Sequence, residues 1–551
     1  MQSQETTERR STKADRGVAA LCERVHGRQH VIETMLIQLT RGLAVTAEVE
    51  RKRCHVSARH VFGEVHVVLF PASVSVHDDD PRRAGRSRPQ VRGNPLREGH
   101  LGRIHGREHT PTACYVPPFM SALEHVLPPS ATVESDHLFV GGCDLVALAD
   151  QHGTPLVIYD EGLLRQTMRE YRDAFATRAP GSEVLYASKA YFGQAVLRMA
   201  NDEGLSVDVA SGGELYAAVA AGFPAEHIYM HGNNKDAREL DELMGVGVTT
   251  VIVDGFDEIA LVAERAEAHG IRQGVLVRVT PGVEPDTHAF ISTGQVDSKF
   301  GFPLGGGLAA DAVARIRANT HLEFAGLHAH IGSQLLALDG FASAAKVMAD
   351  FALSIGGDVR VLDMGGGLGI AYTRDEQPPS IEAYADAVVG AVNAAWAEAG
   401  LDRPKLLVEP GRSIVGRAGV TVYRVGGVKQ IPNVRTYVGV DGGMSDLLRP
   451  MLYGATYEVV VANRAAEPTN GTARIVGKHC ESGDVLVREA SLPEVERGDL
   501  ICLPATGAYG VSMASNYNGV TRPAVVFVDG GDHRVVTRRE TYRELIARDI
   551  T

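Results

Sequence analysis

Cysteine is scarce in this chain of 551 residues: six are spread along it, and no two form a C-x-x-C pair. The sequence therefore argues against a zinc site or redox motif built on paired cysteines. No stretch approaches the roughly 20 apolar residues needed to cross a bilayer. The polar start, MQSQETTERRSTKADR, lacks the apolar segment of a secretory signal. These absences predict a protein of the reducing cytoplasm with no membrane partner.

Positive charge is also in short supply. The formal net charge is −13, and only nine residues are lysine. The balance is uneven, because residues 1–119 hold 19 Lys and Arg against 13 Asp and Glu, whereas the remainder holds 36 against 55. An acidic body is a poor partner for nucleic acid or anionic membrane, so neither is expected.

Residues 1–119 differ from the rest of the chain. They contain nine of the 21 histidines, and the stretch 77–100 has no hydrophobic period. Three interpretations are open: a basic regulatory arm, a disordered tail, or upstream residues that precede a true translation start at Met120. The third is favoured, because a regular segment, SALEHVLPPSATVE, follows Met120 directly. None of the three places chemistry in this region.

From about residue 155, short apolar runs alternate with amphipathic helical stretches. Eight runs count toward a barrel: VLYASKA (184–190), SVDVASGGE (206–214), IYMHGNN (228–234), TVIVDG (250–255), VLVRVTPG (275–282), FAGLHAHIGS (324–333), VRVLDMGGG (359–367) and KLLVEPGR (405–412). Alternating strands and helices predict parallel βαβ units, and eight of them predict a closed (β/α)8 barrel. The alternative is an open doubly wound sheet, but the G-x-G-x-x-G that it should carry after its first strand is missing.

After about residue 416 the sequence becomes strand-rich, with Gly/Asp turns and little helix. This pattern predicts a second, all-β, barrel-like domain. We therefore divide the chain into an atypical extension (1–119), a segment expected to pair with the β domain (120–160), the (β/α)8 barrel (161–416) and the β domain (417–551).

The carboxyl ends of barrel strands form the active-site face in such folds. Here they present Lys189, Asp208, His231, Asp254, Arg278, His330 and Glu409. Lys189 stands out in an otherwise apolar run, and burial is expected to lower its pKa and favour the neutral amine that forms a Schiff base. On position alone, a lysine reaching for solvent explains it as well.

An anion site is indicated after the last two barrel strands. Gly365, Gly366 and Gly367 follow the seventh strand, and Arg412 follows the eighth. Glycines expose backbone N–H groups, and arginine offers a fixed fork to phosphate oxygens. A plain turn explains the glycines alone, but their conjunction with Arg412 favours phosphate binding at the usual place in such barrels.

Three further side chains could take part in cofactor binding or proton transfer. Glu409 ends the eighth strand, where a carboxylate would keep a pyridine nitrogen protonated. His330 could stack on a ring, although a lone histidine is more often a core residue. Cys480, in GKHCESGD, lacks ligand spacing and is either a proton donor or a buried structural cysteine.

Ten segments of the sequence together resemble a known family. The matching segments are YASKA, DVASGGEL, HGNNK, TGQVDSKFG, GLHAHIGSQ, LDMGGGLGIAY, EPGRSIVG, DGGMSDLLRPMLYGATYE, CESGD and GAYGVSMASNYNGVTRP. They resemble the diaminopimelate decarboxylases, which use pyridoxal 5'-phosphate and share the alanine-racemase-like fold with ornithine and arginine decarboxylases. The resemblance runs from about residue 135 to the C-terminus, so residues 1–119 match nothing in the family.

The resemblance implies roles for particular residues. Lys189 would hold the cofactor covalently, Cys480 would donate a proton, and Glu409 would pair with the pyridine nitrogen. Residues implied in holding the cofactor or its phosphate are Lys189, His330, Ser333, Gly365, Gly366, Gly367, Glu409, Gly411, Arg412 and Tyr509. Residues implied in binding substrate are Arg412, Arg449, Tyr453, Glu481 and Tyr509. Cys480 and Glu481 would reach the site from a partner subunit, so a homodimer is implied. His479 departs from the usual neighbour of that cysteine.

The implied reaction is decarboxylation of meso-2,6-diaminopimelate to L-lysine, the last step of lysine biosynthesis. The distal end of that substrate carries an amine and a carboxylate, which call for an acid (Glu481) and a cation (Arg449). An ornithine, lysine or arginine decarboxylase would need only the acid, and this remains the alternative. A catalytically dead relative would lack Lys189 or Cys480, and a racemase would need a tyrosine base opposite Lys189. No metal is expected.

Overall fold

The computed structural model describes residues 121–283 and 298–550. The interpretations of residues 1–119, and the first residue of the segment that begins at Met120, lie outside these residues. Part of the TGQVDSKFG segment also lies outside them. Among the described helices, none is both long enough and apolar enough to cross a membrane.

Eight parallel strands close into a barrel, as the sequence predicts. Their bounds are β5 (Glu183–Ala187), β6 (Ser206–Val209), β7 (Ile228–Met230), β8 (Thr250–Val253), β9 (Gln273–Thr280), β11 (Leu322–His328), β12 (Val361–Asp363) and β13 (Lys405–Val408). Each pairs with the next, and β13 pairs with β5 to close the ring. A short strand, β10 (Phe302–Pro303), pairs with the carboxyl-terminal end of β9. The barrel prediction is confirmed, and the open-sheet alternative is wrong.

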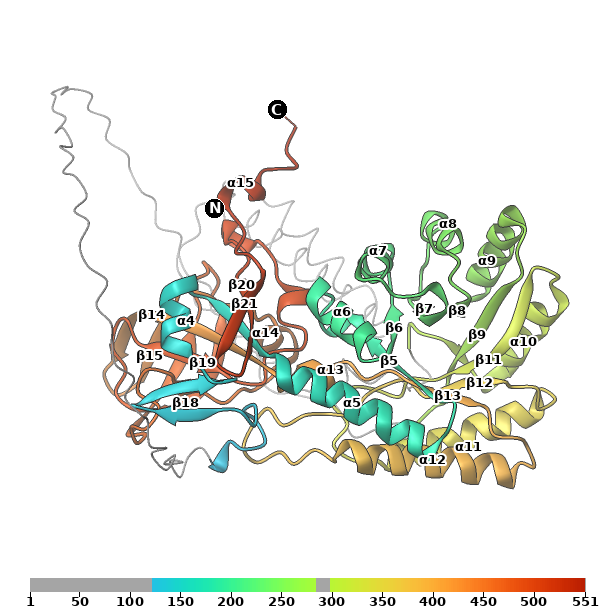
Figure 1. The fold of residues 1–551 in the computed structure, drawn as a ribbon, viewed down its shortest axis with the longest axis horizontal. Coiled ribbons are helices and arrows are strands. Elements are labelled where there is room, and N and C mark those ends of the chain that lie inside the picture. Colours follow the sequence, from blue (N-terminus) through green and yellow to red (C-terminus); the bar gives the residue numbers. More distant parts are fainter. Residues whose placement is uncertain (1–120, 284–297, 551) are drawn as a thin grey trace, which may run out of the picture. The chain divides into compact units, whose positions relative to one another are not determined.

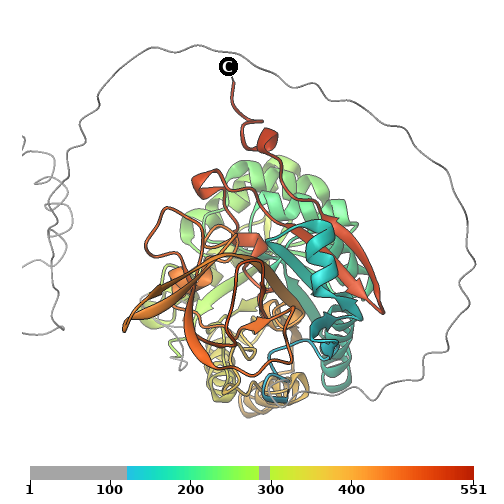
Figure 2. The same ribbon diagram turned by 90° about the vertical axis from the view of Figure 1, so that its left-hand side faces the viewer.

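Helices cover the outside of these strands (Figures 1 and 2). They are α5 (Glu161–Arg178), α6 (Gln194–Asp202), α7 (Gly212–Ala221), α8 (Ala237–Val246), α9 (Phe256–His269), α10 (Leu308–Ala318), α11 (Asp339–Ser354) and α12 (Ile381–Glu398). The short α13 (Arg412–Val415) follows the carboxyl end of β13. Their sequences explain their limits. For example, α8 begins at a capping box of Asp236 and Glu239 and ends at Gly247, whose φ of 91° suits glycine.

A second sheet follows the barrel, and it too agrees with the sequence. Its strands run in the order β18-β17-β15-β14-β4-β20-β21, with β19 joined to β14 and β16. Their bounds are β4 (Leu156–Asp160), β14 (Gly419–Ile431), β15 (Arg435–Val440), β16 (Val460–Val461), β17 (Gly471–Val476), β18 (Val485–Leu492), β19 (Leu500–Leu503), β20 (Ala524–Asp529) and β21 (Asp532–Thr537). The strand β4 precedes the barrel in sequence, yet lies between β14 and β20.

Smaller elements complete the described chain. They are β1 (Thr132–Glu134), β2 (His137–Val140), β3 (Cys143–Asp144), α4 (Leu145–His152), α14 (Arg449–Tyr453) and α15 (Tyr542–Leu545). The strands β1, β2 and β3 form a separate three-stranded sheet.

The inside of the barrel is built in layers. An apolar layer contains Leu185, Tyr229, Ile252, Leu276 and Leu407. Side chains two residues apart on a strand point to the same side. The residues two positions beyond Tyr229, Ile252, Leu276 and Leu407 are His231, Asp254, Arg278 and Glu409, so a polar layer lies directly above the apolar one, at the carboxyl ends of the strands.

Candidate active site

A cavity of about 540 Å³ opens above the polar layer. Most of the residues that the sequence singles out line it: Lys189, His330, Ser333, Glu409, Arg412, Arg449, Tyr453 and Tyr509. Residues from the barrel and from the segment that follows it therefore meet at one place. This convergence on the carboxyl-terminal face is the position expected for a barrel active site.

Lys189 lies in a single turn directly after β5. Its Nζ is 3.6 Å from Asp208 Oδ2, and 46% of its side-chain surface is exposed. Because Lys189 lines the cavity, this exposed surface faces the cavity. The amine is thus presented to a molecule in the cavity and does not reach out for bulk solvent.

The ionisation of Lys189 corrects one sequence-based expectation. Burial lowers its pKa, as expected, but the negative charges of Asp208 and Glu409 outweigh burial and raise the pKa above its ordinary value. In the ligand-free chain Lys189 is therefore an ammonium group. Asp208 stands beside it with a pKa raised to about 7 by burial. The ionised form of this carboxyl group stabilises the ammonium form of Lys189.

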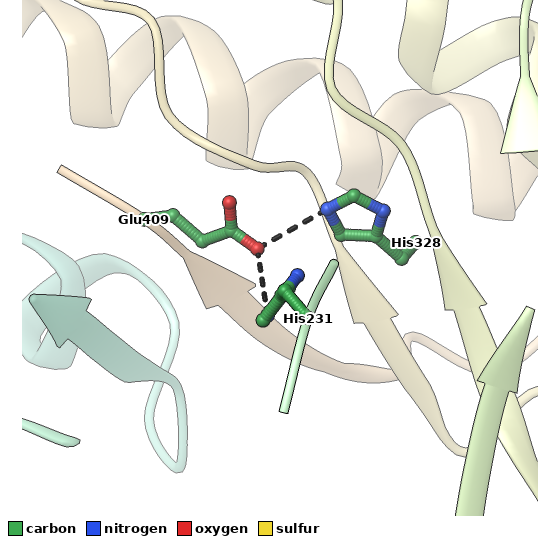
Figure 3. Close-up of side chains that lie close together, drawn as sticks. All are labelled: His231, His328 and Glu409. Carbon is green, nitrogen blue, oxygen red and sulfur yellow. Dashed lines mark ion pairs between the residues drawn. The ribbon is translucent and has the colours of Figure 1, made fainter. Parts of the chain in front are cut away.

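Glu409 sits on the floor of the cavity between two buried histidines (Figure 3). Its Oε1 is 3.2 Å from His231 Nε2 and 3.1 Å from His328 Nε2. Burial opposes the charge of Glu409, but the two histidines and Lys189 hold its pKa well below the usual range. Burial lowers the pKa of both histidines. The carboxylate therefore stays charged at neutral pH.

The same three residues resemble a zinc donor set, since two histidines and a glutamate ligate zinc in some enzymes. Their ligand atoms lie within 4.8 Å of one another. Lys189 and Arg278, however, act electrostatically on His231 as positive neighbours. That charge opposes a divalent cation. An N–H group with a single positive charge fits the place better, and we assign no metal here.

The glycine run after β12 brings the backbone against the cavity floor. A Cβ on Gly366 would lie 2.1 Å from the Glu409 carbonyl oxygen, so only glycine fits. The Gly366 N–H donates to His330 Nδ1 over 3.2 Å. Burial lowers the pKa of His330 to about 3. His330 therefore offers a neutral aromatic ring to the cavity. Gly365 and Gly367 flank this contact with φ values of 68° and 122°.

Arg412 begins α13 next to the lysine turn. A Cβ on Gly411 would meet the Ala187 carbonyl oxygen at 3.0 Å, so this glycine lets the two segments approach. Arg412 Nη2 donates to Ser333 Oγ over 2.9 Å, and Nη1 donates to Tyr372 Oη. Its Nε is buried and has no hydrogen-bond partner among the described residues. Such a donor is available to bind an anion.

Arg449 and Tyr453 occupy the two ends of α14, four residues apart, so they share one helix face. The Arg449 guanidinium lies 4.4 Å above the Tyr372 ring and donates to Tyr457 Oη. The side chain is buried, and it faces the cavity. The geometry presents a fixed cation at the wall of the cavity.

Tyr509 adopts a left-handed backbone conformation, with φ of 58°. Its N–H donates to the Ala190 carbonyl, and its ring lies 4.9 Å from the Arg412 guanidinium. A non-glycine residue held in this region of φ is strained. Strain of this kind is typical of residues fixed for function.

Cys480 and Glu481 do not line the cavity. Both are exposed on a turn of the β domain, where the Cys480 N–H donates to Asn518 Oδ1 over 2.9 Å. The buried core cysteine considered from the sequence is therefore wrong. His479 is buried beside them, and its Nδ1 lies 2.7 Å from Asp484 Oδ2. One chain alone does not bring Cys480 or Glu481 to the cavity.

Several contributors to the site had no assigned role from the sequence. His328, Asp363, Tyr372 and Tyr457 belong to the quoted segments, yet nothing in them separately marks a site residue. His328 carried one usable signal, since it stands two residues before His330. Asp208, His231 and Arg278 were placed at strand ends without a role.

Comparison with known proteins identifies the family. A family model described as "Pyridoxal-dependent decarboxylase, pyridoxal binding domain" matches residues 161–416. A diaminopimelate decarboxylase of Bacillus subtilis is 46% identical over 418 residues, covering 75% of this chain and 95% of that protein. A diaminopimelate decarboxylase of Synechocystis is 44% identical over 452 residues, covering 80% and 96%. The chain belongs to the diaminopimelate decarboxylase family.

Solved structures agree with this family. The diaminopimelate decarboxylase of M. jannaschii in co-complex with L-lysine is 34% identical, with a TM-score of 0.71, covering 77% of this chain and 98% of that one. A lysine/ornithine decarboxylase of Vibrio vulnificus is 22% identical, with a TM-score of 0.60, covering 70% and 97%. The second likeness shows the shared fold alone.

Proposed function

We propose that this chain decarboxylates meso-2,6-diaminopimelate to L-lysine with pyridoxal 5'-phosphate as cofactor. The observation that carries the proposal is the meeting of Lys189, Glu409 and Arg412 around one cavity, in a chain whose relatives are named diaminopimelate decarboxylases. The alternative of an ornithine-type or lysine-type decarboxylase is less favoured, because the relatives at 44% and 46% identity are named diaminopimelate decarboxylases.

The residues present fit pyridoxal 5'-phosphate. Among the described residues Arg412 Nε is a buried donor without a partner, and the Gly366 backbone lies against Glu409, three residues before Arg412, so the site offers a phosphate both a positive charge and a glycine backbone. The Glu409 carboxylate suits a protonated ring nitrogen. Lys189 presents its amine to the same cavity. Bound there, the cofactor supplies an electron sink for the pair left when carbon dioxide departs.

The chain's own groups then have distinct tasks. Arg412 and Ser333 would bind the phosphate, and the neutral His330 ring would contact the cofactor. Glu409 keeps its negative charge throughout and so stabilises a positive ring N–H. Lys189 Nζ would hold the cofactor, and the neighbouring Asp208 would stabilise the protonated form of that amine. The carbon that loses carbon dioxide receives a proton from Cys480 Sγ or Lys189 Nζ.

Substrate selection follows from Arg449. A fixed, buried guanidinium binds the distal carboxylate, with Tyr453 and Tyr509 beside it, and a lysine or ornithine substrate has no such carboxylate. Changing Arg449 to alanine is expected to lower kcat/KM for diaminopimelate about 100-fold, because a charge-assisted contact worth several kcal/mol is lost. Any residual turnover of lysine or ornithine should change little.

Rates on all three substrates should be measured for Arg449→Ala and for the matched variant Arg449→Lys. The lysine variant keeps the charge but loses the two-pronged geometry, so an intermediate loss on diaminopimelate is expected. Equal losses on every substrate would contradict a role in selecting the distal carboxylate.

We further propose a homodimer in which Cys480 and Glu481 of one chain complete the cavity of the other. Support comes from their exposure on the β domain and their absence from the cavity of their own chain. Glu481 would bind the distal amine opposite Arg449. The buried His479–Asp484 contact fixes the turn that presents them.

Mixing two inactive variants tests this arrangement. Lys189→Ala and Cys480→Ala proteins are each expected to be nearly inactive. After subunits exchange, mixed dimers carry one intact site, so about a quarter of all sites regain wild-type activity. Each variant mixed with itself is the control. No recovery, despite demonstrated exchange, would place Cys480 in its own subunit's site or outside the reaction.

We also propose a cytoplasmic location. The three cysteines in the described part of the chain, Cys143, Cys480 and Cys502, are all free. Free thiols fit a reducing compartment.

The proposed function is tested by carbon dioxide release. Purified protein with added pyridoxal 5'-phosphate is expected to release it from meso-diaminopimelate and to form lysine, with at most weak release from ornithine or lysine. Preferred turnover of ornithine would favour the alternative, and no release from any of the three would overturn the enzyme assignment.

A further inference from the structure

Two buried acidic side chains, Asp363 and Glu409, come from neighbouring strand ends, and of the two only Glu409 lines the cavity. They come from the neighbouring parallel strands β12 and β13, where Asp363 pairs with Leu407 and Glu409 follows two residues later. Leu407 belongs to the apolar layer inside the barrel and Val361 packs against that layer, so Asp363 and Glu409, each two residues further on, also point inward. The two carboxyl groups are close enough that the charge of Glu409 acts on Asp363. Asp363 is fully buried, and Glu409 is 4% exposed.

The contact needs a proton. Asp363 Oδ1 accepts the Gly365 N–H over 2.8 Å. Asp363 Oδ2 is buried, and among the described residues no N–H or O–H group reaches it. Two ionised carboxylates have only acceptors and repel each other in a buried site. A hydrogen bond between them therefore requires that one of the two carries a proton.

The surroundings decide which one. Glu409 has His231 and His328 against its Oε1 and Lys189 nearby, and these hold its pKa well below normal. Asp363 has no such support: burial and the charge of Glu409 raise its pKa well above its ordinary value. The other groups that act on these carboxyls are Asp208, Arg278, Tyr229 and Tyr384.

The charge balance of the polar layer points the same way. Four buried carboxyl groups lie there, from Asp208, Asp254, Asp363 and Glu409. The cations beside them are Arg278 and Lys189. Burying a surplus of negative charge is costly, so an acid without a cation of its own keeps its proton.

We propose that Asp363 is a neutral carboxylic acid at neutral pH, and that its Oδ2–H donates to Glu409 and so positions that carboxylate for the cofactor ring nitrogen. Asp363 is a positioning residue, because it acts through Glu409 and does not line the cavity. The positioning part rests on the proposed function, whereas the proton on Asp363 does not.

Three substitutions distinguish donation to Glu409 from the other contact of Asp363, which accepts the Gly365 N–H. Asp363→Asn keeps an oxygen for Gly365 N–H and replaces the O–H by an N–H donor, so cofactor affinity should stay within about threefold of wild type. Asp363→Ser keeps a short acceptor for Gly365 N–H but is too short to reach Glu409. Asp363→Ala keeps neither. Serine and alanine should both weaken cofactor binding about tenfold or more, because a buried carboxylate loses its donor.

Cofactor affinity is measured on the full-length protein from the visible absorbance of bound pyridoxal 5'-phosphate. If Asp363 serves only the Gly365 N–H, serine should behave like asparagine, and this outcome would overturn the proposal. A loss in Asp363→Asn as large as in Asp363→Ala would also overturn it, because asparagine supplies the same donor.

Infrared spectroscopy of the cofactor-free protein tests the proton directly. The carbonyl stretch of a protonated carboxylic acid should be present in wild type and absent in Asp363→Asn. Recording at about pH 9 removes the signal of Asp208, which titrates near 7 and is ionised there. No difference between the two proteins would refute the proton on Asp363 even if the chain proves to be a decarboxylase. A clear difference without decarboxylase activity would instead refute the proposed function.

Discussion

Replacing Lys189 by alanine is expected to abolish turnover, with a fall in kcat of at least about 10³-fold, because Lys189 both holds the cofactor and exchanges protons at the reacting centre. The amine stands 3.6 Å from Asp208 at the open cavity, and no other described lysine approaches this position except Lys235, whose Nζ is engaged by Glu258 and two backbone carbonyls. No neighbouring amine can therefore replace it.

Visible absorbance and turnover together check this prediction. The variant should lose the absorbance that reports covalent attachment, while its thermal unfolding changes little, because Lys189 is not a core residue. Lys235→Met is the matched lysine control and is expected to affect stability as well as activity, since it would leave the buried Glu258 unpaired. Retained covalent absorbance in Lys189→Ala would show that another residue holds the cofactor.

Replacing Glu409 by glutamine is expected to lower kcat about 10²-fold to 10³-fold, since it removes a preorganised charge from the place where positive charge must persist on the ring. The substitution is nearly isosteric, so the contacts with His231 and His328 can be kept in part. The effect should thus fall on kcat more than on folding.

Steady-state kinetics and the pH dependence of the bound cofactor's spectrum report this change. Loss of the carboxylate should lower the pKa of the ring nitrogen, because the neighbouring negative charge that favours its protonated form is gone. Glu409→Asp retains the charge but shortens the reach, and an intermediate rate is expected. An unchanged kcat in Glu409→Gln would remove Glu409 from the mechanism.

The sequence predicts the framework of the molecule well, for a physical reason. Each barrel strand is a short apolar run between amphipathic helices, and this pattern is local. Residues at the strand ends, such as Lys189 and Glu409, inherit their common location from the barrel itself. Arg449 and Tyr453 were found through the resemblance, and their position on one helix face brings both to the cavity.

The side-chain contacts between residues on different strands could not be predicted from the sequence. The pairing of His328 with Glu409, and of Asp363 with the same carboxylate, depends on the adjacency of β11, β12 and β13. The expected lowering of the Lys189 pKa was wrong because its sign is set by Asp208, which is 19 positions away in the chain. Local burial alone could not reveal that charge.

The position of β4 has a consequence for how this protein can be divided. The strand is made before the barrel, but it pairs on one side with β14 and on the other with β20, both made after it. A cut near residue 161 would remove an inner strand and leave two exposed edges that invite aggregation. The barrel is thus inserted in sequence between two strands of the second sheet. A single cleavage of the chain therefore cannot separate the barrel from the complete second sheet.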